Sequence, residues 1–205
     1  IPWGTHAVTL KATRYILWAL IAVVATGIAL FALRQPENAA QQDSKIVIGG
    51  PFTMTSHLGQ PVTEKDYLGH PMAMFFGFTN CPDICPTTLL RMTELMTKLG
   101  PDADKLQVVL VSVDPERDTP EILKSYLEQF DPRFSAMTGT PEQLAAFAKG
   151  YRFVYKQISL QDGNYTMDHS AGVYLYDANG QFRSTLDPHE ENAIALQKLR
   201  LLIGG

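Results

Sequence analysis

The chain has 205 residues, with 17 Lys or Arg against 21 Asp or Glu, which gives a formal net charge of −4 at pH 7. This acidic balance excludes a general nucleic-acid-binding protein, because such a protein needs a basic surface. The length suits one globular domain with a hydrophobic core and a shorter additional segment.

An uncharged apolar segment occupies residues 15–33. As a helix rising about 1.5 Å per residue it reaches about 28 Å, close to the roughly 30 Å hydrocarbon core of a bilayer. The sequence LRQP at 33–36 is a poor exit for a cleaved signal peptide, although Ala39 and Ala40 leave cleavage open as an alternative. We therefore predict an uncleaved transmembrane anchor over 15–33.

The charges that flank this segment predict its orientation. Lys11 and Arg14 precede it, whereas Arg34 alone follows it closely. The positive-inside bias, although it amounts to a single charge, places residues 1–14 in the cytoplasm and the rest of the chain across the membrane. In a bacterium this is a single-pass inner-membrane protein whose soluble domain faces the periplasm.

A polar segment, 34–45, follows the predicted anchor and contains no aromatic or β-branched residue. Such a composition cannot bury a core and predicts a flexible linker. The remaining residues, 46–205, have the size of one domain. Outside the cytoplasm, cysteines in this domain need a reducing partner to stay as thiols.

The domain sequence alternates between strand and helix patterns. Residues 46–63 predict a β-hairpin, and the strands predicted after it are 72–78, 106–113, 153–158, 172–176 and 181–186. The predicted helices are 86–99, 119–130, 140–150 and 190–203. This order predicts an α/β domain of the thioredoxin-like kind with an N-terminal β-hairpin extension. The junction after the first core strand is then the active corner.

The two cysteines, Cys81 and Cys85, lie at this junction. Their spacing is one residue longer than the C-x-x-C of thioredoxin-like redox proteins, which favours a metal site over a dithiol switch. A purely structural disulfide is disfavoured, because a bridge across so short a loop removes little entropy from the unfolded chain.

The histidines offer a third donor for a metal. Four of them lie away from the predicted corner, before the membrane span or in connections: His6, His57, His70 and His189. His169 directly precedes the predicted strand 172–176, where thioredoxins place a cis-proline against the cysteine corner. From position alone, His169 is either a ligand or a solvated loop residue.

Acidic residues near the cysteines have structural interpretations. We interpret Asp83 as a helix-start residue rather than a partner-facing charge. Asp114 and Asp118 are interpreted as caps of helix 119–130 rather than as metal ligands. Met167 is interpreted as a core residue rather than a soft axial contact of a metal.

Four motifs together are specific to one family: GGPF at 49–52, FGFTNCPDICPTTL at 76–89, VSVDPERDTP at 111–120 and DHS at 168–170. They resemble the Sco (SenC) family of copper chaperones for cytochrome c oxidase, and the resemblance covers the whole soluble domain. It implies a thioredoxin-like fold, with Cys81, Cys85 and His169 as copper ligands. It also implies that the copper is delivered to the dinuclear copper-A site of oxidase subunit II.

The donor types agree with this resemblance. Thiolates select Cu(I), and an added imidazole also accommodates Cu(II). Three protein ligands leave the metal open to an incoming thiolate, as a carrier that releases its metal requires. Structural zinc normally has four protein ligands. Catalytic zinc held by two cysteines, a histidine and water stays open as an alternative, although no acid or base is evident to use it.

We therefore predict a copper chaperone that is not an enzyme and has no catalytic residue. The alternatives are a membrane-tethered thiol–disulfide oxidoreductase, a peroxidase of the wider thioredoxin superfamily, or a redox sensor. All use the same redox-active pair, Cys81 and Cys85, and a thiol reductant protein is an expected partner of that pair. His169 discriminates between the classes, because copper binding needs it and dithiol exchange does not.

Overall fold

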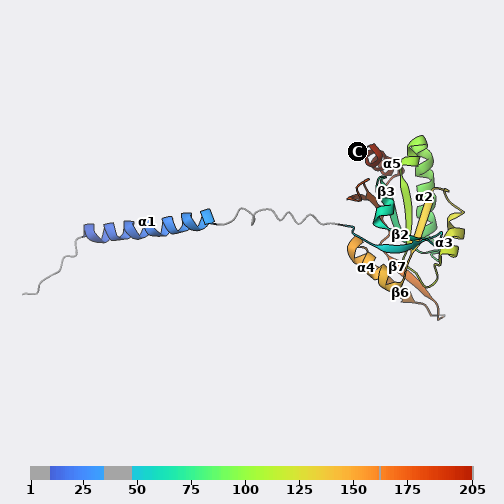
Figure 1. The fold of residues 1–205 in the computed structure, drawn as a ribbon, viewed down its shortest axis with the longest axis horizontal. Helices are drawn as coiled ribbons and strands as arrows, with labels where there is room; N and C mark the ends of the chain where they lie inside the picture. Colours follow the sequence, from blue (N-terminus) through green and yellow to red (C-terminus); the bar gives the residue numbers. More distant parts are fainter. Residues whose placement is uncertain (1–9, 35–47, 162, 205) are drawn as a thin grey trace, which may run out of the picture. The chain divides into compact units, whose positions relative to one another are not determined.

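The computed structural model describes residues 10–34, 48–161 and 163–204 (Figure 1). The chain divides into two compact units, 1–46 and 47–205, which are described separately below. His6 and most of the predicted linker at 34–45 lie outside the described residues.

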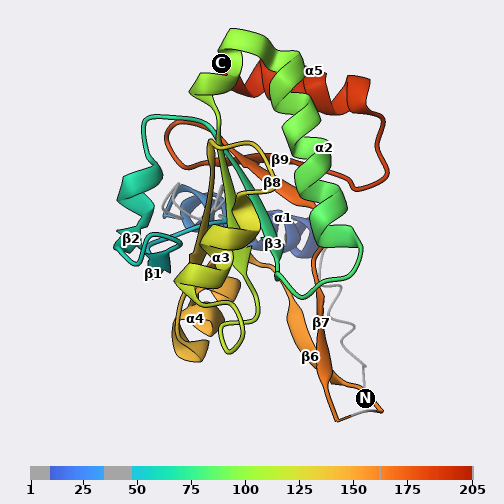
Figure 2. The same cartoon turned by 90° about the vertical axis from the view of Figure 1, so that its right-hand side faces the viewer.

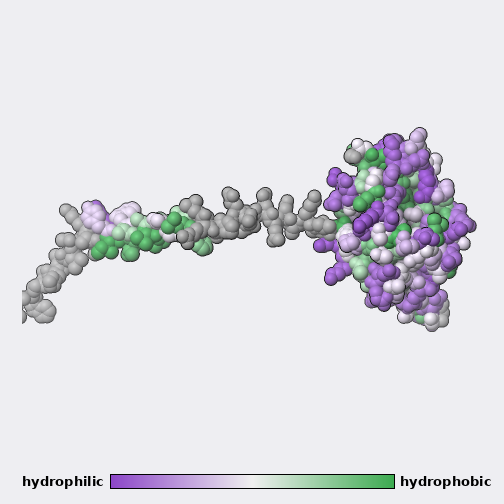
Figure 3. Space-filling model, in the orientation of Figure 1, coloured by the Kyte–Doolittle hydropathy of each residue, from purple (hydrophilic) through white to green (hydrophobic). Residues whose placement is uncertain are grey.

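The first unit contains the helix α1 (Leu10–Arg34). Its segment Arg14–Phe31 has the length and composition to cross a membrane, and none of that segment is buried within the protein. Figure 3 shows hydrophobic side chains along the helix. Trp18, Val23 and Phe31 are among its exposed large apolar residues. A membrane anchor and a signal sequence share these properties, so α1 supports either of them.

The second unit is built around a seven-stranded mixed sheet of order β2-β1-β5-β4-β3-β8-β9. Its strands are β1 (Thr53–Ser56), β2 (Pro61–Thr63), β3 (Met72–Gly77), β4 (Gln107–Ser112), β5 (Phe134–Thr138), β8 (Val173–Tyr176) and β9 (Phe182–Leu186). Strands β3, β4 and β5 are parallel, whereas β1, β8 and β9 are antiparallel to their neighbours. The predicted hairpin extension is thus the pair β1–β2.

A separate two-stranded sheet consists of β6 (Tyr155–Ser159) and β7 (Tyr165–His169). Figure 2 shows this hairpin projecting from the body of the second unit. Strand β6 is exposed over most of its length, and β7 is partly buried.

The helices of the second unit are α2 (Ile84–Leu99), α3 (Pro120–Leu127), α4 (Pro141–Tyr151) and α5 (Asn192–Gly204), with short 3₁₀ turns η2 (Glu64–Tyr67) and η3 (Gly100–Lys105). Helix α2 packs beside α5, and α3 packs on β5. Threonine caps start two of the helices: Thr119 accepts a hydrogen bond from the Ile122 amide, and Thr140 accepts one from Gln143.

The core lies around β3 and β4, whose apolar runs are buried on both faces of the sheet. Phe75, Phe76 and Leu110 are almost fully buried. The predicted mixed α/β domain, with its first core strand leading into the cysteine corner, is therefore confirmed.

Two strands were not predicted from the sequence. The segment 134–138 was assigned to a connection between helices, yet it forms β5 in the centre of the sheet. Its sequence, FSAMT, combines the strand-favouring Phe134 and Thr138 with Ala136, which is depleted in strands, so tertiary pairing with β4 decides its conformation. Strand β7 was assigned to the loop before β8, but it pairs with β6 over its whole length.

Some helix boundaries also differ from the prediction. Helix α2 begins at Ile84 instead of Pro86, so Cys85 lies in its first turn. A proline is tolerated there because the first amides of a helix have no partner within the helix. Helix α3 ends at Leu127 instead of residue 130.

Candidate metal centre

The two cysteines lie on either side of the start of α2. Cys81 is in the loop after β3, where its amide donates to the Phe78 carbonyl at 3.3 Å and its side chain is partly exposed. Cys85 is buried, and both residues are free thiols. The loop therefore presents the partly exposed Cys81, and the first turn of α2 holds the enclosed sulfur of Cys85.

His169 ends β7 and contacts the enclosed thiol. Its Nε2 lies 3.5 Å from Cys85 Sγ, and its Nδ1 lies 3.1 Å from the Ser170 carbonyl oxygen. A carbonyl oxygen only accepts, so this contact favours the proton on Nδ1 and leaves the Nε2 lone pair facing the sulfur. The rings of Phe75 and Phe78 pack edge-on against the imidazole with centroids 6.1 Å and 5.9 Å away.

Burial sets the protonation of this pair. It raises the pKa of the Cys85 thiol well above its usual range, and the neighbouring Cys81 adds to the shift. Burial also lowers the pKa of His169. At neutral pH the site thus holds a neutral Cys85 thiol and a neutral imidazole, and a metal that binds Cys85 must displace its proton.

The predicted ligands do not all converge in this structure. Among the described residues, no three His, Cys, Asp or Glu side chains lie close enough to hold a metal ion as they stand. Cys85 interacts with each of the other two predicted ligands: it contacts His169, and Cys81 raises the pKa of its thiol. The donor types, two sulfurs and one imidazole nitrogen, suit copper. The set of Cys81, Cys85 and His169 remains a prediction, and a metal bound by all three requires these side chains to move closer together.

The other described histidines lie elsewhere. His57 is in the β1–β2 turn, with its Nδ1 3.2 Å from the Ala136 amide that can donate to it. His70 and His189 are exposed residues of connections. These three are loop residues, as predicted, and the structure brings His169 to the cysteine corner.

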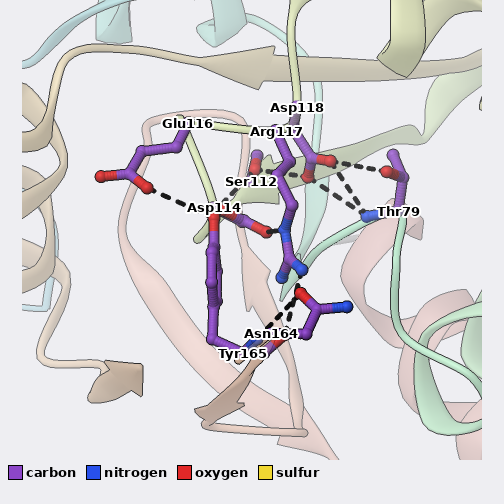
Figure 4. A network of polar contacts seen from close by, with 8 residues as sticks. All are labelled: Thr79, Ser112, Asp114, Glu116, Arg117, Asp118, Asn164 and Tyr165. Atoms are coloured by element: carbon purple, nitrogen blue, oxygen red, sulfur yellow. Dashed lines mark hydrogen bonds and ion pairs between the residues drawn. The ribbon is translucent and has the colours of Figure 1, made fainter. Parts of the chain in front are cut away.

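The interpretation of Asp118 and Asp114 as helix caps was wrong. Thr119 caps α3, whereas the buried Asp118 carboxylate accepts hydrogen bonds from three donors in the loop after β3 and at the end of β4 (Figure 4). These donors are the Thr79 amide at 3.1 Å, the Thr79 hydroxyl at 2.6 Å and the Ser112 hydroxyl at 2.6 Å. Burial raises the pKa of Asp118 despite these donors. Asp118 therefore holds the start of the cysteine loop.

Asp114 has a second role in the same network. Its carboxylate pairs with Arg117 and accepts a hydrogen bond from the Tyr165 hydroxyl at 2.8 Å. The sequence reasoning overlooked Thr79, Arg117 and Tyr165. A usable signal existed for Thr79 and Arg117, because the ends of neighbouring parallel strands meet at one edge of a sheet, and the loops after β3 and β4 carry these two side chains. Tyr165 begins β7, which was assigned to a loop.

Asp83 and Met167 have the surroundings that were expected of them. Asp83 is the N-cap residue of α2, although its side chain accepts no capping bond from the backbone. Met167 is partly buried and packs against the core.

Comparison with known sequences places the chain in a family. The SCO1/SenC family model matches residues 40–204, and the chain therefore belongs to the SCO1/SenC family. It is 38% identical over 152 residues to the Mus musculus "Protein SCO1 homolog, mitochondrial", a match that covers 73% of this chain and 54% of the mouse protein. It is 37% identical over 160 residues to a SCO2-like protein of Rickettsia felis, a match that covers 75% of this chain and 78% of the Rickettsia protein. The chain thus spans about half the length of the mouse relative.

Solved structures show the same fold. Bradyrhizobium japonicum ScoI with copper bound has 42% identity and a TM-score of 0.71, covering 76% of this chain and 99% of that chain. Yeast Sco1 with copper bound has 33% identity and a TM-score of 0.70, and the match covers 78% of this chain and 90% of the yeast chain. A further match, BsSco, is described as a member of the Sco family of cytochrome c oxidase assembly proteins and, at 24% identity, supports the fold alone. The predicted family and the thioredoxin-like fold are confirmed.

Proposed function

We propose that this protein is a membrane-anchored copper chaperone that binds one copper ion through Cys81, Cys85 and His169. It delivers the ion to the copper-A site of cytochrome c oxidase subunit II. The observation that carries the proposal is the 3.5 Å approach of Cys85 Sγ to His169 Nε2, next to a second free thiol. Two structural relatives, which are Sco proteins, have been solved with copper bound.

The arrangement suits a carrier of copper as Cu(I) or Cu(II). The two sulfurs are soft donors that bind Cu(I), and the imidazole accommodates Cu(II) in addition. Cys85 is enclosed, whereas Cys81 and His169 are both partly exposed. An incoming thiolate from an acceptor protein can therefore approach from the side of Cys81, and ligand exchange transfers the metal.

Proton release accompanies loading. Because burial keeps the Cys85 thiol protonated at neutral pH, copper binding displaces that proton. His169 needs no deprotonation, because burial disfavours its cationic form. Delivery reverses the exchange when Cys85 takes up a proton again.

The helix α1 supplies the anchor in this proposal. Its apolar window Arg14–Phe31 spans the bacterial inner membrane, and the copper-binding unit faces the periplasm. Copper donor and acceptor are then on the same face of one membrane. A thiol reductant protein returns Cys81 and Cys85 to the dithiol state that binds copper.

A second candidate function is thiol–disulfide exchange or redox sensing by the same cysteine pair. The interaction between Cys81 and the Cys85 thiol favours it, since Cys81 is near enough to raise the pKa of Cys85 further. The two functions differ in their need for His169.

Cell experiments separate the two. Deletion of the gene is expected to lower oxidase activity, and added copper should restore part of it. Under limiting copper, a His169→Ala strain should behave like the deletion, whereas His189→Ala, a change of an exposed histidine, should behave like wild type. Normal oxidase activity in the His169→Ala strain would instead favour the oxidoreductase.

A further inference from the structure

The strand that carries His169 presents one face to the body of the domain. Side chains alternate along a strand, so Tyr165, Met167 and His169 share a face of β7. All three are partly buried, whereas Asp168 on the other face is exposed. Met167 packs on the core and His169 contacts Cys85. The inner face of β7 therefore attaches to the body at three points.

The third point is Tyr165, and it is held by Arg117. The Arg117 guanidinium lies over the Tyr165 ring, 3.7 Å from its centroid, and Nη1 donates to the Tyr165 carbonyl at 3.0 Å. Asp114 links Arg117 and Tyr165. Its carboxylate forms an ion pair with Arg117 and accepts a hydrogen bond from the Tyr165 hydroxyl (Figure 4). We call Arg117 and Tyr165 the latch.

Arg117 also lies near Phe78, a residue that packs against the His169 imidazole. Its guanidinium carbon lies 5.8 Å from the centroid of the Phe78 ring, and that ring packs edge-on against His169. Phe78 is almost fully buried and precedes the cysteine loop. Arg117 thus contacts both segments that meet at the thiol–imidazole pair.

The β6–β7 hairpin needs such an attachment. An isolated two-stranded hairpin is marginally stable in water, and its two strands pair with each other and not with the seven-stranded sheet. The base of the hairpin is closed by bonds between Val154 and Ser170. Without the latch, the hairpin would be held by that base, by the packing of Tyr155 and Met167 on the core, and by the contacts of His169 itself.

From these contacts we propose that Arg117 and Tyr165 are positioning residues: the latch fixes the orientation of β7 and so keeps His169 Nε2 at the cysteine pair. The inference rests on the proposed function, because it assigns the latch to the imidazole ligand of copper. According to this proposal, the three predicted copper ligands are positioned by two different parts of the structure. The thiols depend on the loop between β3 and α2, whereas the imidazole depends on the latch.

The test compares Cu(I) and Cu(II) binding to the full-length protein in detergent, each measured against a competing chelator. Arg117→Met keeps the aliphatic stem and removes the donors and the charge. It is expected to weaken Cu(II) binding about tenfold, the lower end of the loss typical of residues that orient metal ligands. Cu(I) binding, which the two thiols support, should stay within about twofold of wild type. Tyr165→Phe, which keeps the ring under Arg117, should have a smaller effect on Cu(II) than Arg117→Met.

A double-mutant cycle separates positioning from general destabilisation. In a His169→Ala background, Arg117→Met should leave Cu(II) binding unchanged, because the ligand that it positions is already gone. The matched control is Arg183→Met, an exposed arginine of β9, which should leave both copper affinities at wild-type values. Equal losses of Cu(I) and Cu(II) binding, or a full effect of Arg117→Met in the His169→Ala background, would overturn the proposal.

Hydrogen exchange of the metal-free protein gives an independent readout. Arg117→Met should speed exchange of the β6 and β7 amides and leave β3 and β4 as protected as in wild type. If the β6 and β7 amides of Arg117→Met exchange as slowly as those of wild type, the latch is contradicted. This result does not depend on whether the wild-type protein binds copper. Failure of the wild type to bind copper would overturn the proposed function alone.

Discussion

Gly77 shows how tightly the backbone approaches the enclosed cysteine. A Cβ at this position would meet Phe75 Cε1 at 2.7 Å and Cys85 Sγ at 3.0 Å. The end of β3 therefore forms one wall against the sulfur, and only a residue without a side chain leaves Cys85 in place. The sequence contains this glycine within the motif FGFTNC, but its close approach to the sulfur depends on how α2 packs.

Substitution of Gly77 should displace Cys85. Gly77→Ala is expected to lower the free energy of unfolding by about 1–3 kcal/mol, the usual cost of an added methyl group in a packed core. Chemical denaturation measures this change. The control is Gly172→Ala, where the nearest atom to a new Cβ, the Leu186 carbonyl oxygen, is 3.5 Å away, an ordinary contact. Equal stability of Gly77→Ala and wild type would show that the sulfur has room to move.

The two thiols should react at different rates. The nucleophile is the thiolate, and a raised pKa leaves less of it at a given pH. The buried Cys85, whose pKa is raised by burial, should be alkylated by iodoacetamide far more slowly at pH 7 than the partly exposed Cys81. The rate at Cys85 should increase as the pH rises. Single-cysteine variants, Cys81→Ser and Cys85→Ser, report each rate separately, and faster labelling of Cys85 would contradict the burial described for it.

At the scale of elements, the cysteine loop is attached to the sheet by a polar bond network. Thr79 follows β3, and Asp118 follows β4, so the parallel pairing of these strands brings their ends together. The Thr79 hydroxyl donates to Asp118 at 2.6 Å. This bond stabilises the loop at the end that follows β3.

Removal of that hydroxyl should cost stability. Thr79→Val keeps the shape of the side chain but leaves the buried Asp118 carboxylate with one donor fewer, which is expected to lower the free energy of unfolding by about 1–3 kcal/mol. Thr79→Ser keeps the hydroxyl and should lose less than Thr79→Val. The comparison is made by urea unfolding followed by circular dichroism. A Thr79→Val protein as stable as wild type would show that the bond contributes nothing net.

The sequence predicts some elements better than others for physical reasons. The runs that form β3 and β4 are almost continuously apolar, because both faces of these strands are buried, and they were assigned correctly. The segment of β5 lacks such a run, and its conformation depends on long-range pairing with β4 and β1. Local propensity carries no information about such pairing.

The candidate site shows the same division. Cys81, Cys85 and His169 were selected from the sequence, and the contact between Cys85 and His169 agrees with that selection. The strand that carries His169 was assigned to a loop, because β7 pairs with β6 at the surface and lacks a continuous apolar run. The roles of Asp114 and Asp118 depend on side-chain partners far apart in sequence, so a local capping rule could not identify them.

At the scale of the whole molecule, the proposed function assigns the apolar helix α1 as a membrane anchor that places the second unit outside the cytoplasm. Lys11 and Arg14 on its N-terminal side favour a cytoplasmic N-terminus by the positive-inside rule. A reporter that is active only when exported should be active when fused after Lys45. Mass spectrometry should find the mature protein with α1 still attached. A mature N-terminus near Ala40 would contradict the anchor.

The most direct test of the central claim is copper binding by the full-length protein in detergent. Wild type is expected to bind one Cu(II) with an intense thiolate-to-copper charge-transfer absorption. Cys81→Ser, Cys85→Ser and His169→Ala should each lose that band, and His189→Ala should keep it. Full copper binding and an unaltered spectrum in any one of the first three variants would contradict the proposed ligand set.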